Sequence, residues 1–173
     1  MRNILAVLVE NKPGVLTRVA GLFSRRGFNI ENIAVGDTME PGISRMTITV
    51  DADAETLEQI VKQLNKLVNV IKISNITNDP SVLRELMLVK VNADIGNRSD
   101  IQQIVETFRG KVVDVAPNSM IIEVTGNEEK LEAIKLLLKD FGIREIVRTG
   151  TIALVRGSKT TTLDNIDAEE RKG

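Results

Sequence analysis

Four residue types are missing from this chain of 173 residues, and each absence removes a class of function. There is no cysteine and no histidine, which excludes disulfides, thiolate nucleophiles, cysteine-ligated metals and the commonest general base. Tryptophan and tyrosine are also absent, and the four phenylalanines are too few to stack the bases of single-stranded nucleic acid. The composition therefore predicts no metal site and lowers the expectation of a catalytic site, leaving carboxylate, lysine or serine chemistry open.

An excess of charge of either sign is missing too. The chain carries 23 Lys and Arg against 24 Asp and Glu, a net charge of −1, so we expect neither a nucleic acid nor a membrane surface as partner. No apolar run approaches the roughly 20 residues of a membrane span. The first residues lead straight into an apolar stretch without a small-residue cleavage site. We therefore expect a cytoplasmic protein.

The most informative stretch is residues 4–36, which predicts strand, turn, helix, turn and strand. An apolar run ends at Val9, and Asn11, Pro13 and Gly14 then mark a sharp turn. Gly27 ends the helix, and a second strand runs over residues 28–35. The spacing of an amphipathic helix is carried by Val15, Leu16, Val19, Leu22 and Phe23.

The turn at residues 11–14 predicts a site for a free amino acid. The first backbone N–H groups of a helix lack partners and attract a carboxylate, and glycine lets a ligand approach closely. The carboxamide of Asn29 could accept hydrogen bonds from an ammonium group. A plain structural role is equally consistent with the spacing: Asn11 caps the helix, Pro13 starts it and Gly14 relaxes the turn.

The order of elements predicts the fold. Strand, helix, two strands, helix and strand follow one another over residues 1–76, which is a ferredoxin-like βαββαβ arrangement. Residues 77–83 form a linker, and the same order returns over residues 84–157. We predict an α+β protein of two ferredoxin-like domains in tandem. Residues 158–173 are polar, and we expect them to be frayed or to order on a partner.

The first strand is apolar on both faces, with Ile4, Ala6 and Leu8 on one side and their neighbours on the other. Helices cover one face of such a sheet. The other face then meets a second copy or a larger partner, or else a central strand tolerates exposed apolar residues.

Several runs together resemble a known family. The runs NKPGVL at residues 11–16 and RGFNI at 26–30 resemble an ACT domain, the amino-acid-sensing regulatory module. The sequence up to about Gly157 resembles, in register, the small regulatory subunits of acetolactate synthase, also called acetohydroxyacid synthase. The resemblance is carried further by RRGFNIENI at 25–33, SRMTI at 44–48, QLNKLVNV at 63–70, ELMLVKV at 85–91, FRGK at 108–111 and RTG at 148–150.

The resemblance implies a homodimer without an active site that binds the catalytic large subunit, activates it and confers feedback inhibition by valine in branched-chain amino acid biosynthesis. Thiamine diphosphate, FAD and magnesium would sit on the catalytic subunit, with no cofactor in this chain. The effector would lie between paired ACT domains. The residues matched to that site are Asn11, Gly14, Val15, Leu16, Asn29 and Ile30.

The second half lacks the Pro-Gly helix start, since its corresponding turn is residues 92–97. We therefore expect effector binding in the first domain, and contact with the catalytic subunit from the second. The main alternative is an ACT-domain sensor that regulates a different metabolic enzyme. An acylphosphatase-like hydrolase is disfavoured because its phosphate loop needs an arginine, whereas this turn offers Lys12 and the first arginine after it is Arg18. A nucleic-acid regulator is disfavoured by the absence of a basic face.

Overall fold

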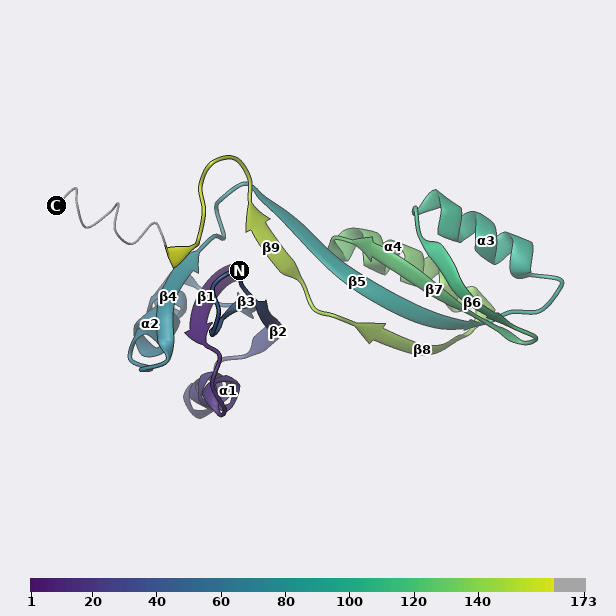
Figure 1. Ribbon diagram of the computed structural model, residues 1–173. Helices are drawn as coiled ribbons and strands as arrows, with labels where there is room; N and C mark the ends of the chain where they lie inside the picture. Colours follow the sequence, from purple (N-terminus) through teal and green to yellow (C-terminus); the bar gives the residue numbers. More distant parts are fainter. Residues whose placement is uncertain (164–173) are drawn as a thin grey trace. The chain divides into compact units, whose positions relative to one another are not determined.

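The computed structural model describes residues 1–163, which form two units (Figure 1). The first unit contains residues 1–82 and 153–163, and the second contains residues 83–152. Each unit has two helices; the first contains a four-stranded antiparallel sheet, and the second sheet has the same four-strand plan with a fifth strand added. This arrangement confirms the predicted α+β class and the two βαββαβ units in tandem.

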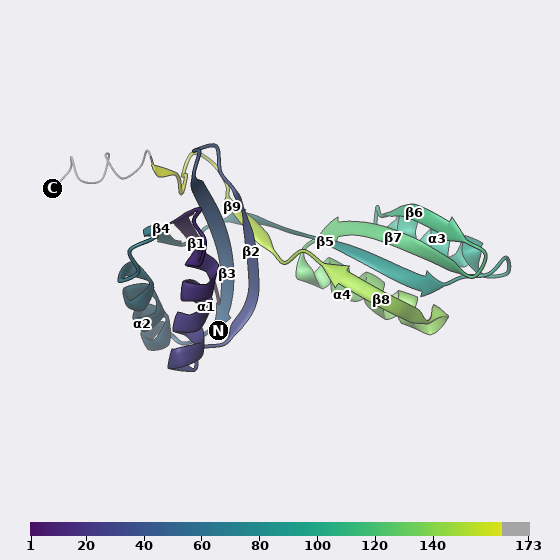
Figure 2. The same cartoon turned by 60° about the horizontal axis from the view of Figure 1, so that its bottom comes forward.

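In the first unit the strand order is β2-β3-β1-β4, so β2 and β4 are the edges. Both helices pack on one face, and alternate residues of the central strands β1 and β3 meet them there (Figure 2). Of the predicted stripe of α1, Val15, Val19, Leu22 and Phe23 are buried and Leu16 is exposed. The helix ends at Gly27, because glycine adopts the left-handed backbone there, with φ 69°. The elements are β1 (Arg2–Glu10), α1 (Val15–Arg26), β2 (Ile30–Asp37), β3 (Ile43–Asp51), α2 (Ala54–Asn65) and β4 (Val70–Asn75).

The second unit repeats this plan with the order β6-β7-β5-β8, and a further strand, β9, pairs with β5. Its core lies between the helices and alternate residues of β5 and β7. The hairpin turn at Pro117-Asn118 joins β6 to β7. The elements are β5 (Ser81–Asn92), α3 (Arg98–Thr107), β6 (Lys111–Ala116), β7 (Ser119–Gly126), α4 (Glu128–Leu138), the short 3-10 helix η1 (Lys139–Phe141), β8 (Ile143–Arg148) and β9 (Ile152–Val155).

The division into units differs from the predicted boundaries at two places. The first unit runs to residue 82, and β5 begins at Ser81, inside the predicted linker of residues 77–83. The sequence assigns residues 84–157 to the second domain and begins a polar tail at 158, whereas residues 153–163 pack with the first unit. Within this segment Ala153, Val155 and Thr161 are buried. Residues 158–163 of the predicted tail thus lie in the first unit, and the remainder, 164–173, lies outside the described residues.

The sheet face away from α1 and α2 is also buried in the first unit. Ala6 and Leu8 of β1 lie on it beside Thr47 and Thr49 of β3, and all four side chains are buried. Part of the cover comes from the chain itself, because Arg45 on this face bonds to residues 153 and 161. The apolar outer face of β1 therefore does not by itself require a second copy.

Candidate functional site

The first turn of α1 presents free backbone donors. Gly14 takes the N-cap position in the left-handed region, with φ 85°, and no side chain caps the turn. The N–H of Val15 reaches the Lys12 carbonyl at 3.3 Å, and the N–H of Arg18 reaches the Gly14 carbonyl at 3.0 Å. Within residues 1–163, the N–H groups of Leu16 and Thr17 have no acceptor. This turn is suited to an anion such as a carboxylate.

Asn11 does not cap the helix, so that alternative for its role is removed. Its backbone N–H instead donates to the Gly42 carbonyl at 2.8 Å, which ties the turn to the hairpin between β2 and β3. Its side chain is exposed. The carboxamide of Asn11 is therefore open to a ligand while its backbone holds the loop in place.

A polar network that the sequence did not reveal supports the same loop. Asn69 accepts a hydrogen bond from the guanidinium of Arg18 and donates to Oε2 of Glu10 at 3.0 Å. Lys12 pairs with the same carboxylate oxygen at 2.9 Å, and this hydrogen bond, with that from Asn69, lowers the pKa of Glu10. Asn69 lies 59 positions from Glu10, so no local pattern predicts this contact.

These pairings also bear on the hydrolase alternative. Lys12 is held by Glu10, and Arg18 by Asn69, so the two cations of this turn are already engaged. Within residues 1–163 no group of three or more acidic side chains could hold a metal ion. No helix among the described residues is long and apolar enough to cross a membrane. The arrangement suits binding of a small zwitterion better than phosphate chemistry.

The predicted apolar contacts of the effector differ in exposure. Val15 is 4% exposed and belongs to the core beneath α1, so its side chain packs inward. Leu16, the next residue, is 49% exposed, as the helical rotation of about 100° per residue requires. Ile30 is half-buried against the core, and Asn29 is exposed. Leu16, Ile30 and Asn29 thus retain surface for a ligand.

The structure separates the predicted site residues into two groups. Gly14 precedes α1 and Asn29 follows it, and the 12 residues of this helix span ~18 Å at the rise of an α-helix. The two ends of strand β3 show the same separation. Asn11 donates to the Gly42 carbonyl just before the start of β3, whereas Ile30 pairs with Val50 near the other end of β3. One protomer therefore does not bring the turn and Asn29 together.

Two cavities in the first unit lie away from these residues. One, of about 470 Å³, is lined by residues of α2, β4 and the N-terminus, among them Asn3, Leu57 and Asn75. The other, of about 300 Å³, lies between the hairpin of residues 37–43 and residues 161–163. Neither is lined by a residue of the predicted effector site.

The corresponding turn of the second unit is closed by its own side chains. Oδ1 of Asp94 accepts from the N–H groups of Gly96 at 2.8 Å and Asn97 at 3.1 Å, and Oδ1 of Asn97 accepts from the N–H of Asp94. These bonds order the loop before α3, but α3 itself begins without a side-chain cap, as α1 does. The two first turns differ in charge: α3 carries Asp100 there, which disfavours an anion, whereas α1 carries no acidic residue.

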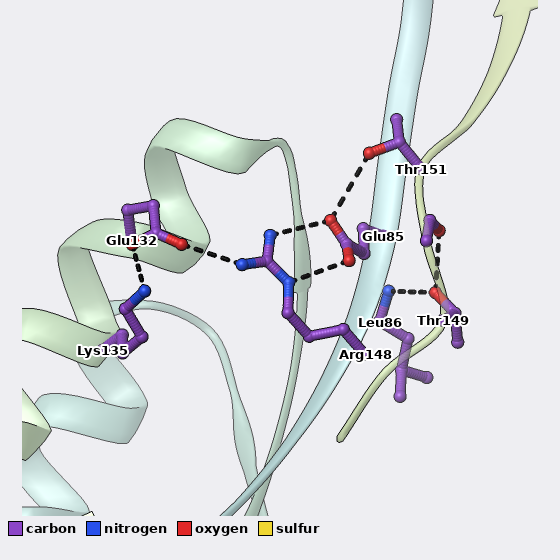
Figure 3. A network of polar contacts seen from close by, with 8 residues as sticks. Glu85, Leu86, Glu132, Lys135, Arg148, Thr149 and Thr151 are labelled. Atoms are coloured by element: carbon purple, nitrogen blue, oxygen red, sulfur yellow. Dashed lines mark hydrogen bonds and ion pairs between the residues drawn. The ribbon is translucent and has the colours of Figure 1, made fainter. Parts of the chain in front are cut away.

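The most buried charge of the second unit belongs to a fully paired cluster at one end of its sheet (Figure 3). Glu85, which is 4% exposed, accepts two hydrogen bonds of 2.9 Å from Arg148. Arg148 also pairs with Glu132 of α4 at 2.8 Å, and Glu132 in turn contacts Lys135. Hydrogen bonding to Arg148 lowers the pKa of Glu85, and the same bonds raise the pKa of Arg148. The cluster joins β5, β8 and α4, and its partners leave no free charge for catalysis.

Comparisons with known proteins cover both units. The family described as AHAS small subunit-like ACT domain matches residues 5–72, and that described as small subunit of acetolactate synthase matches residues 84–157. The chain is 55% identical over 159 residues to the probable acetolactate synthase small subunit of Methanothermobacter thermautotrophicus, covering 91% of this chain and 95% of the relative. It is 57% identical over 157 residues to the acetolactate synthase small subunit of Mycobacterium bovis, covering 91% and 94%.

A solved structure supports the same likeness. The crystal structure of the acetolactate synthase small subunit from Thermotoga maritima matches with a TM-score of 0.85 at 44% identity. The match covers 92% of this chain and 99% of that one.

Proposed function

This chain belongs to the family of acetolactate synthase small subunits, which are regulatory subunits. We propose that it activates the catalytic large subunit and makes that subunit sensitive to feedback inhibition by valine. Thiamine diphosphate, FAD and magnesium would belong to the large subunit. The observation that carries the proposal is the open first turn of α1 with Asn29 at the opposite end of the same helix.

The separation of these two groups favours a site shared by two copies. Among the described residues, the strand β2 is an edge of the first sheet, so no other strand of that sheet lies along its outer side. Two copies related by a two-fold axis would pair their β2 strands antiparallel, which sets the Ile30 end of one strand beside the Asp37 end of the other. The turn of residues 11–14 lies at the Asp37 end through its bond to Gly42. Such a homodimer would join each turn to the partner copy's Asn29.

The chemistry of the joined site fits an aliphatic amino acid. The N–H groups of Leu16 and Thr17 would bind the carboxylate, and the carboxamides of Asn11 and Asn29 would accept from the ammonium group. The side chains of Leu16 and Ile30 would contact the aliphatic group, while Val15 supports the turn from the core. This assignment also includes Gly14, whose missing side chain leaves the approach to the turn open.

Inhibition requires that valine bind one conformation of the complex better than another. Couplings of this kind are typically about 1–3 kcal/mol, or roughly 5- to 150-fold in an equilibrium. An effector held between two copies is suited to this task, because its contacts depend on how the two copies are arranged.

Mixing two defective variants tests the shared site. Gly14→Asp damages the turn, and Asn29→Ala damages the other half, so each variant alone should bind valine at least tenfold more weakly by calorimetry. After the two are unfolded and refolded together, a mixed dimer has one site with both defects and one site with none. About one quarter of the sites should then regain the unmodified affinity if dimers form at random.

The matched control is the refolded mixture of each variant with itself, which should regain nothing. A mixture without restored sites, from variants that form mixed dimers by mass spectrometry, would contradict the shared site. Undiminished valine affinity in both single variants would contradict the assignment of the residues.

A further inference from the structure

The segment of residues 153–163, which we call the strap, is held across the outer face of the first sheet at several points. Arg45 donates from Nη2 to the Ala153 carbonyl at 2.6 Å and from Nη1 to Oγ1 of Thr161 at 2.5 Å. Lys72 donates to the Thr162 carbonyl at 3.0 Å. The two cationic side chains thus form hydrogen bonds to the strap near its beginning and near the last described residues.

The anchors lie in one row across three strands. Arg45 of β3 and Lys72 of β4 are both register partners of Leu8 in β1, on the face away from the helices. Leu8 is buried, and it lines the cavity of about 300 Å³ together with Thr161 and other strap residues. The strap therefore crosses the sheet at this row.

Two further contacts hold the strap to the chain that leaves the first sheet. Nζ of Lys159 pairs with Asp79 at 2.8 Å, and the N–H of Arg156 donates to the Pro80 carbonyl at 2.7 Å. Both partners lie between β4 and β5 in the chain. The strap itself follows directly after residue 152, the last residue of the second unit. It is thus the segment through which the chain returns from the second unit to the first.

The hairpin between β2 and β3 lies between this strap and the predicted effector turn. On one side, its Gly42 carbonyl accepts from the N–H of Asn11. On the other side, residues 37–40 and Ile43 line the cavity opposite residues 161–163, with Arg45 in the same wall. A shift of the turn on binding a ligand would act on the hairpin through Asn11, and the open space of the cavity lets the hairpin move toward or away from the strap.

We propose that Arg45 is a positioning residue for regulation: it fastens the strap to the first sheet, and the hairpin of residues 37–43 links this fastening to the occupancy of the effector turn. The strap would be held differently with and without effector, and the difference would reach the second unit along the chain. The inference rests on the proposed valine-sensing function, and it adds the element that transmits the signal.

The test uses the full chain together with its catalytic large subunit. Arg45→Met keeps the length and the apolar stem of the side chain but removes the donors to Ala153 and Thr161. We expect valine to bind this variant within about twofold of the unmodified affinity by calorimetry. We expect hydrogen exchange of residues 153–163 to accelerate at least tenfold, and the inhibition of the holoenzyme at saturating valine to weaken at least fivefold, the lower end of typical couplings.

The matched control is Arg156→Met, which removes an exposed arginine of the strap itself. Among residues 1–163 its side chain has no hydrogen bond or ion pair, so exchange and inhibition should both stay as in the unmodified chain. A milder second variant, Thr161→Val, removes one acceptor of Arg45 and keeps the side-chain shape. It covers the case in which Arg45→Met does not fold, and it should change exchange and inhibition in the same direction by a smaller factor.

The outcomes separate the two proposals. Normal valine binding with unchanged inhibition in a folded Arg45→Met or Thr161→Val variant would overturn the role of the strap and leave the sensing function in place. Faster exchange of the strap without weaker inhibition would also overturn it. Absence of valine binding to the unmodified chain would overturn the sensing function, and the role of the strap with it.

Discussion

The loops before α1 and α3 occupy the same place in their two units, yet they differ in structure and charge. Both helices begin without a side-chain cap, and in the first unit Gly14 takes the N-cap position with no acidic residue in the first turn. In the second unit the side chains of Asp94 and Asn97 accept from N–H groups of the loop before the helix, and Asp100 places a negative charge in its first turn. The topology is the same in both units, so a ligand site here depends on a few residues of one loop rather than on the fold.

The outer sheet faces differ as well. In the first unit this face is buried, in part by the strap, through bonds from Arg45 and Lys72. In the second unit Leu88 and Val147 are paired neighbours on the outer face, and they remain 37% and 57% exposed. The second unit instead concentrates its polar bonding at the Glu85 cluster. Among the described residues, the second unit therefore keeps part of its outer sheet face exposed, whereas the first unit does not.

The largest expected effect tests the Glu85 cluster. Arg148→Met leaves a carboxylate that is 4% exposed without its ion-pair partner, which should destabilise the second unit by about 3–5 kcal/mol. The measurement is the exchange of core amides in β5 and β7, with those of β1 and β3 as internal reference. Adding Glu85→Gln to this variant removes the unpaired charge and should recover most of the loss. A uniform loss of protection in both units would contradict an effect confined to the second.

The next effect tests the difference between the two turns. Gly14→Asp places a preferred capping side chain at the open turn, in a backbone conformation that costs a side chain about 1–2 kcal/mol. Its carboxylate would compete with the ligand for the same donors, so valine affinity should fall at least tenfold. A Cβ here meets nothing within 4 Å, so the variant should fold. Gly157→Asp is the control, because this residue also has a positive φ, 77°, and open surroundings; it should leave valine affinity unchanged.

The pH dependence of the second unit provides a smaller effect. The folded-state pKa of Glu85 lies below the ordinary glutamate value of 4.5, chiefly because Arg148 donates hydrogen bonds to its carboxylate. Its contribution to stability is therefore fully present above pH 4.5 and is lost as the pH falls through the lowered pKa. Denaturant unfolding followed by circular dichroism suits a chain without Trp or Tyr. Glu85→Gln should flatten the slope below pH 4.5, and an unchanged slope would contradict this origin.

The smallest effect comes from an ion pair of the first unit. Lys62 and Glu58 contact one another on α2, four residues apart, and both side chains are 66% exposed. Water and salt screen such a pair, so Lys62→Met should leave the free energy of unfolding nearly unchanged in denaturant unfolding. A loss of stability as large as that of Arg148→Met would contradict the view that solvent exposure makes the Lys62–Glu58 pair weaker than the Arg148–Glu85 pair.

Much of the fold follows from the sequence by itself. The spacing of apolar residues along the chain determined two βαββαβ units. A helical spacing indicates a segment that buries one stripe, and an alternating spacing indicates a strand that buries every second side chain. Gly27 and the pair Pro117-Asn118 marked the end of a helix and the turn of a hairpin for equally local reasons. The turn at residues 11–14 was likewise visible from its Pro and Gly, whereas the structure was needed to show that Asn11 does not cap the helix.

The tertiary structure decided everything that joins distant positions. Arg45 and Thr161 are 116 positions apart, and no pattern of neighbours indicates that one holds the other. The length of α1 and the register of β3 decided that Gly14 and Asn29 of one protomer lie at opposite ends of this helix. Local signals act through the backbone over a few residues, whereas these contacts depend on which faces remain to be covered once the sheets and helices have packed.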